Sequence, residues 1–197
     1  MNSSILRAGI VTLACALGLS ACGGGDGDLN LYGSVSGVTK DGLVLKNGGS
    51  EVAVVAPYLS FQFDSRVATD DSFNIEVAKT PSNVESCTVV NGKARANYYT
   101  IAQISVFCQV KTHKFAVAVN GLTGSGLVIV NGADNRAVAP GTTSVAMNPV
   151  NEDGAYGVSI LTQPAGQTCK VSGGDNGTGA GTMRDTDLNG KVVVSCA

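Results

Sequence analysis

One histidine and six cysteines are the residues of this chain best suited to chemistry. A nucleophile–histidine pair would need His113 beside a serine or cysteine in a cleft. His113 falls at the junction between two predicted modules, where we favour a solvated linker residue. With a single histidine and no clustered acid pair, we predict no catalytic residue and no enzyme.

The segment "DTDLNG", residues 185–190, is a candidate for metal binding. It fits the first half of a calcium loop, in which side-chain oxygens bind Ca²⁺ and the glycine makes the sharp turn. The candidate ligands are Asp185, Asp187 and Asn189. The twelfth position should be a bidentate glutamate but is Cys196, so Asp175 or Asp153 would have to supply the missing oxygens. We favour the alternative, a polar turn with a hairpin corner at Asn189, and predict no metal and no cofactor.

A glycine-rich segment, "GGDNGTGAG" at 173–181, superficially suggests a phosphate-binding loop. Such loops need a strand before them and a helix after them, so that the helix amides face the phosphate. No helix is predicted to follow, and we expect a long, mobile hairpin loop.

Aromatic and basic residues gather in "GKARANYYT", residues 92–100. Tyrosine and arginine are favoured at binding surfaces, so this segment is the best candidate contact patch. The patch consists of Lys93, Arg95, Tyr98 and Tyr99. In the alternative, one tyrosine packs on the sheet edge and the other is merely exposed. The aromatic residues of "YLSFQF", residues 58–63, are predicted to lie in the core.

The first residues have the features of an export signal. Arg7 supplies one positive charge, and residues 8–19 form a largely apolar stretch too short to span a bilayer. The sequence Leu19-Ser20-Ala21-Cys22 that follows resembles the lipobox of bacterial lipoproteins. The alternative is an ordinary signal peptide that leaves Cys22 as a free thiol.

The lipobox resemblance implies that residues 1–21 are removed and that Cys22 carries the lipid. Two or more acyl chains give stable membrane anchoring. Glycine and aspartate at 22–29 predict a flexible, solvated tether. In lipoproteins of Gram-negative bacteria an aspartate after the cysteine tends to retain the protein at the inner membrane. Gly23 stands there, which implies the outer membrane and, we expect, the cell surface.

The rest of the chain contains two copies of one module. "GVTKDGLVLKNG" at 37–48 and "GLTGSGLVIVNG" at 121–132 are identical at seven of twelve positions. Two further blocks match in the same order: "TPSNVESCTVVNG" with "QPAGQTCKVSGG" after a one-residue slip, and "ISVFC" with "VVVSC". We assign the modules to residues 30–111 and 112–197. The short junction predicts a rod with restricted bending.

Four cysteines remain after Cys15 and Cys22, and an even number in an exported chain indicates disulfides. Four cysteines allow three pairings. The repeat selects two bonds, Cys87–Cys108 and Cys169–Cys196. A zinc site is the competing use of four cysteines, but the usual C-x-x-C spacing is missing.

Alternating residues predict strands throughout. In "FNIEVAK", for example, Phe73, Ile75 and Val77 fall on one face. Asn-Gly pairs punctuate the chain and suit tight hairpins, and no segment after Cys22 has a helical period. The fold class is therefore all-β, with two antiparallel β-sandwich modules. The second copy resembles a module that recurs in bacterial surface and secreted proteins, usually described as Ig-like, although the chain has no tryptophan.

Charge excludes one class of partner. Without Arg7, twelve basic and fifteen acidic residues give a net charge of −3, which argues against nucleic acid. We expect a non-catalytic outer-membrane lipoprotein that presents loops to a host surface, a polymer or a protein. The alternative is a periplasm-facing structural or assembly factor that engages an envelope protein.

Overall fold

The computed structural model describes residues 28–197. The predicted signal peptide, the predicted lipidation site Cys22 and most of the predicted tether lie outside the described residues. Within the described part, no helix is long and apolar enough to cross a membrane.

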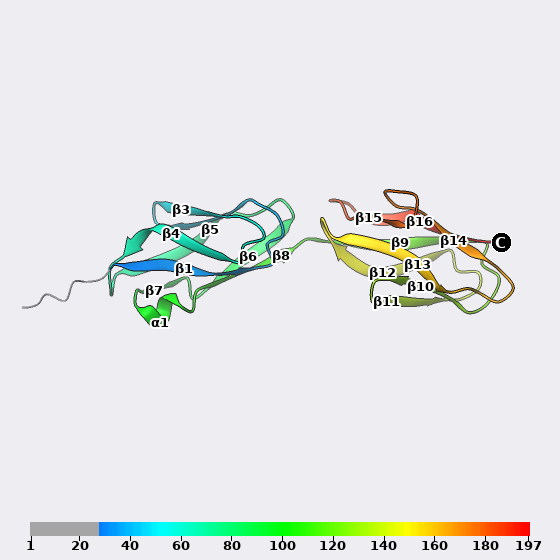
Figure 1. The fold of residues 1–197 in the computed structure, drawn as a ribbon, viewed down its shortest axis with the longest axis horizontal. Coiled ribbons are helices and arrows are strands. Elements are labelled where there is room, and N and C mark those ends of the chain that lie inside the picture. Colours follow the sequence, from blue (N-terminus) through cyan, green and yellow to red (C-terminus); the bar gives the residue numbers. More distant parts are fainter. Residues whose placement is uncertain (1–27) are drawn as a thin grey trace, which may run out of the picture.

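The first module is a sandwich of two four-stranded sheets, ordered β4-β1-β8-β6 and β3-β2-β5-β7 (Figure 1). Its elements are β1 (Leu29–Ser36), β2 (Leu43–Asn47), β3 (Ser50–Val54), β4 (Ser60–Val67), β5 (Ser72–Lys79), β6 (Val84–Val90), β7 (Lys93–Arg95), α1 (Tyr98–Ile101) and β8 (Ser105–Val110).

The second module repeats this order strand for strand, as β12-β9-β16-β14 and β11-β10-β13-β15. Its elements are β9 (Thr112–Asn120), β10 (Leu127–Asn131), β11 (Asp134–Val138), β12 (Ser144–Asn151), β13 (Ala155–Thr162), β14 (Cys169–Gly173), β15 (Ala180–Thr182) and β16 (Leu188–Cys196). The all-β fold with two sandwich modules is confirmed.

Strand direction differs from the prediction in one respect. The first and last strands of each module, β1 with β8 and β9 with β16, pair in parallel, while the other pairs in the described residues are antiparallel. The chain therefore enters a module at one end and leaves it at the other. The two modules follow one another end to end (Figure 1).

Each module has a core of its own, built from the inward side of the strand alternation. Phe73 and Ile75 are buried as predicted, and Phe61 and Phe63 pack edge to face with ring centroids 5.8 Å apart. The prediction was wrong for Tyr58, whose side chain is 69 % exposed. The strand alternation begins only at Ser60, so Tyr58 belongs to the preceding turn.

Both predicted disulfides are present, and each joins directly opposite residues of neighbouring strands in one sheet. Cys87 on β6 faces Cys108 on β8, and Cys169 on β14 faces Cys196 on β16. The repeat therefore selected the right pairing. Each bond fastens an edge strand to the strand that ends its module.

One short helix, α1, was not predicted. Asn97 caps it, because the side chain of Asn97 accepts hydrogen bonds from the amides of Tyr99 and Thr100. The hydroxyl of Thr100 accepts in return from the amide of Asn97 and completes a capping box. A single turn is too short to show a helical period in the sequence.

We predict that replacing Cys87 and Cys108 together by alanine lowers the free energy of unfolding of the first module by about 2–4 kcal/mol, because the bond closes a loop in the unfolded chain. Calorimetry of this variant without reducing agent should show a lower melting temperature for the first module only. The matched control, with Cys169 and Cys196 replaced, should shift the other transition. If either variant lowered both melting temperatures, this would contradict the prediction that each disulfide stabilises its own module only.

Candidate functional site

The joint between the modules is a single residue, Lys111, between β8 and β9. Its amide donates to the carbonyl oxygen of Asn83 in the first module at 2.9 Å. Its carbonyl accepts from the amide of Glu152 in the second module at 2.9 Å. Both backbone groups of the linker are therefore bonded, one to each module, which restricts rotation at the joint.

Side chains reinforce the joint. Asn83 is fully buried, and its amide donates to the hydroxyl of Thr39 at 3.0 Å and to the carboxylate of Asp153 at 3.2 Å. Lys40 reaches the same Asp153 oxygen at 3.3 Å. Lys40 and Asp153 are half-exposed, so this ion pair contributes little. The buried Asn83 amide is the stronger link, because its donors would otherwise lack partners.

The prediction of a solvated linker role for His113 was wrong. Its Nε2 lies 3.2 Å from Oε2 of Glu152, and both side chains are largely buried, at 15 % and 9 % exposed. The reason is that β9 already begins at Thr112 and pairs His113 with Val150 on β12. In the described part of the chain, Glu152 is the one side chain bonded to His113, and both residues belong to the second module. The pair lies beside the joint, because the amide of Glu152 bonds to Lys111.

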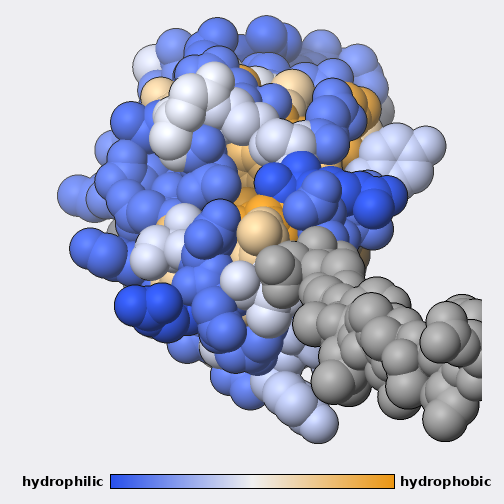
Figure 2. All heavy atoms as spheres, turned by 90° about the vertical axis from the view of Figure 1, so that its left-hand side faces the viewer, coloured by the Kyte–Doolittle hydropathy of each residue, from blue (hydrophilic) through white to orange (hydrophobic). Residues whose placement is uncertain are grey.

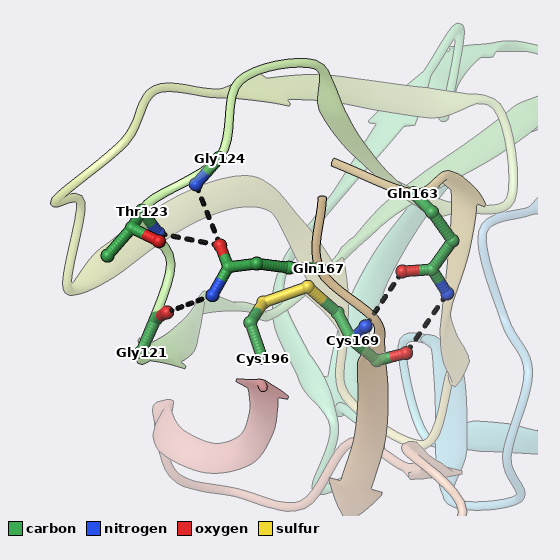
Figure 3. Close-up of a disulfide and its surroundings, with 7 residues drawn as sticks. All are labelled: Gly121, Thr123, Gly124, Gln163, Gln167, Cys169 and Cys196. Atoms are coloured by element: carbon green, nitrogen blue, oxygen red, sulfur yellow. Dashed lines mark hydrogen bonds between the residues drawn. A yellow bond between two sulfur atoms is a disulfide. The ribbon is translucent and has the colours of Figure 1, made fainter. Parts of the chain in front are cut away.

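The far end of the second module, where the chain ends, is the counterpart of the end of the first module that forms the joint. Here Gln167 accepts hydrogen bonds from the amides of Thr123 and Gly124 at 2.8 and 2.7 Å (Figure 3). Gln167 also donates to the carbonyl of Gly121 at 2.8 Å. In the first module, the equivalent loop contains Asn83 and is bonded to the next module. In the second module, Gln167 bonds this loop to other residues of the same module.

The carboxylates considered for calcium bind other groups. Asp187 accepts from the amide of Lys114 at 2.9 Å, and Asp175 accepts from that of Thr182 at 2.9 Å. Asp153 belongs to the joint. Within residues 28–197, no group of three or more histidine, cysteine, aspartate or glutamate side chains is placed to hold a metal ion. The predicted ligands Asp185, Asp187 and Asn189 therefore gain no support from clustering.

Two predicted hairpins near these carboxylates are absent. Asn189 lies inside β16 at an irregularity of its pairing with β9 and does not turn a hairpin corner. The glycine-rich segment 173–181 joins β14 of one sheet to β15 of the other. The segment crosses between the sheets, because β14 pairs with β16 and β15 pairs with β13.

The candidate contact patch lies at the N-terminal end of the first module, where the chain enters β1 (Figure 1). Lys93 and Arg95 are on β7, while Tyr98 and Tyr99 project from α1 and are 72 % and 77 % exposed. Both tyrosines are therefore exposed. Figure 2 faces this end and shows hydrophobic residues at its centre, surrounded by hydrophilic ones. Tyr98 also lines a depression together with Tyr32 on β1.

A small cavity of about 70 Å³ in the second module is lined by Tyr156, Asp175 and Arg184, among others. Burial raises the pKa of Tyr156 above its ordinary value of 10.0, and the charge of Asp175 raises it further. The phenol therefore stays protonated in the folded protein at a pH where the unfolded chain loses its proton.

No protein-family model matches the chain, and no curated protein sequence matches it. Among solved structures, it is similar to the major pilin protein (T-13) from Streptococcus pyogenes serotype GAS131465, with a TM-score of 0.29 and 10 % sequence identity over 87 % of this chain and 97 % of that one. This likeness is too remote to identify the chain.

The joint residues were missed in the sequence, although one signal marks them. Asn83 lies where the two copies slip by one residue, in "TPSNVESC" against "QPAGQTC". The extra residue of the first copy falls where that module contacts the second one.

We predict that Asn83→Ala loosens the joint, because the variant loses the bonds to Thr39 and Asp153, at a cost of about 1–3 kcal/mol. Residual dipolar couplings should fit one alignment tensor for both modules in the parent protein and two different tensors in the variant. Asn135→Ala, an exposed position on β11, is the control and should keep one tensor. A single tensor in Asn83→Ala would show that the backbone bonds of Lys111 suffice.

A second prediction concerns Tyr156. Folding raises the pKa of the Tyr156 phenol. The stability that follows from this shift is fully present below the unfolded-state pKa of about 10, and it is lost as pH rises from there through the higher folded-state pKa. Denaturant titrations at pH 8 and above pH 10 should show this loss for the second module. Tyr156→Phe should remove it, and Phe73 occupies the equivalent position in the first module. An unchanged pH dependence in the variant would contradict the assignment.

Proposed function

We propose that the chain is a non-catalytic binding protein of the outer surface of a Gram-negative bacterium, anchored by lipid on Cys22. The supporting observation is that the chain enters the pair of modules at one end and leaves at the other, with a bonded joint between them. Anchored near its start, such a rod holds its sheets away from the membrane.

The two disulfides support an exported protein, since such bonds form and persist in oxidising compartments. A non-catalytic role is supported by the engagement of His113 with Glu152 beside the joint. The chain's single histidine is therefore paired with a carboxylate within the second module.

The position of the anchor changes how the contact patch is interpreted. Six residues separate Cys22 from Leu29, so the lipid would lie within about 25 Å of the start of β1. Lys93, Arg95, Tyr98 and Tyr99 would then face the membrane side and not the distal tip. Outward-facing surfaces would be the sheet faces and the far end of the second module.

Protease accessibility on intact cells tests this proposal. A cleavage site inserted between Gly48 and Gly49, at the tip of the exposed β2–β3 hairpin, gives a defined target, since nothing lies within 4 Å of an added side chain there. We expect cleavage by the added protease on intact cells. Protection until lysis would overturn the surface location and favour the periplasm-facing structural or assembly factor.

The anchor has its own control. Cys22→Ala should abolish fatty-acid labelling of the protein and release it from the membrane fraction. Cys87→Ala, which leaves Cys22 intact, should keep the label. Labelling of Cys22→Ala would contradict the lipid assignment.

A further inference from the structure

Two aromatic side chains stand on the outer face of the sheet β4-β1-β8-β6 in the first module. Phe107 on β8 is 55 % exposed, and Tyr32 on β1 is 39 % exposed. Val106 beside Phe107 and Leu31 beside Tyr32 point into the core, so the alternation places both rings on the solvent side. Phe107 stands in the middle of the sheet, on β8 between β1 and β6, and its exposure together with Tyr32 on the same face points to a contact surface.

The side chains around Phe107 are polar and uncharged. Its neighbours across the sheet are Ser36 on β1 and Thr88 on β6. Along β8 the nearest positions on the same face are Ser105 and Gln109. In the part of the chain that the structure describes, charged side chains of these strands lie at the borders of this face. Asp64 and Arg66 on β4 lie beyond the row of Tyr32, and Glu85 on β6 lies at the irregularity beside Gln109.

The second module shows that the fold does not require this face. The pair Thr88–Phe107 lies next to the first disulfide, and the equivalent pair next to the second is Lys170–Ser195. Tyr32, paired with Gln62, corresponds to Ala116, paired with Ala146. The same strands therefore form the same sheet without either aromatic ring.

This combination suits a sugar polymer. The C–H face of a sugar ring packs on an aromatic ring, and its hydroxyl groups exchange hydrogen bonds with serine, threonine and glutamine. Protein interfaces share the enrichment in aromatic residues, but they are depleted in serine. Anionic ligands such as nucleic acids require lysine or arginine, and the strand positions between Tyr32 and Phe107 on this face carry neither.

The spacing of the rings indicates a ligand longer than one sugar. Phe107 is paired with Ser36, four residues beyond Tyr32, so the two rings are about 13 Å apart along the strands. Tyr98 lines the same depression as Tyr32 and extends the aromatic surface toward the N-terminal end. A single monosaccharide is too short to contact both Tyr32 and Phe107.

We infer that the outer face of β4-β1-β8-β6 binds an uncharged polysaccharide, with Phe107 and Tyr32 as stacking platforms. The inference deepens the proposed binding function by naming its surface and ligand class. Its test uses purified protein, so the result does not depend on where in the envelope the protein resides.

Affinity electrophoresis of the disulfide-bonded mature chain tests the inference. Gels contain either a neutral polysaccharide (a glucan, a mannan or a galactan) or an anionic one (polygalacturonate). We expect at least one neutral polymer to retard the protein. Phe107→Ser and Tyr32→Ala, which introduce the residues of the second module, should each weaken that retardation about tenfold or more, as expected for the loss of one aromatic platform.

Leu161→Ser is the matched control, because Leu161 is 63 % exposed but lies in the second module; it should bind like the parent. Phe107→Trp supplies the only tryptophan, whose emission should shift on addition of the same polymer. Retardation by the anionic polymer alone, by no polymer, or equally in parent and Phe107→Ser would overturn the inference. Normal melting transitions in Phe107→Ser exclude misfolding as the cause of a loss.

Discussion

The backbone of Lys111 is the constraint on which the arrangement of the molecule depends. A linker residue that bonds to both of its neighbours leaves no free segment to act as a hinge, and the buried amide of Asn83 adds a second link across the same boundary. Domains joined by small polar contacts usually move relative to one another. Here the few polar groups available are placed on the connecting residue itself, where each bond limits rotation most effectively.

Duplication gave two modules with one architecture and different surfaces. The strand order, the disulfide and the inward-facing apolar pattern are shared, since they are what the sandwich needs in order to fold. Positions that face solvent are free of that requirement, and there the copies diverge: aromatic rings at Tyr32 and Phe107 correspond to Ala116 and Ser195. Each copy therefore serves as a reference that separates what the fold requires from what a ligand would require.

Much of the fold could be predicted because it depends on local or repeated patterns. The alternation around Phe73 reports a strand directly, and the repeat identifies the disulfide partners. The contact of His113 with Glu152 could not be predicted, since the two residues lie 39 positions apart and no local sequence pattern marks either of them. The outward position of Phe107 follows from alternation, but its uncharged neighbours become visible only once the pairing of β1, β6 and β8 is known.

The parallel pairing of first and last strands has a mechanical consequence. Opposite forces applied at the two ends of the described chain would pull β1 and β8, and likewise β9 and β16, in opposite directions along their length. The hydrogen bonds between such strands are loaded in shear, all together, and do not open one after another. The parallel pairing spans three residue pairs in the first module and six in the second. Under a rising load the first module, with the shorter row of bonds, would therefore give way before the second.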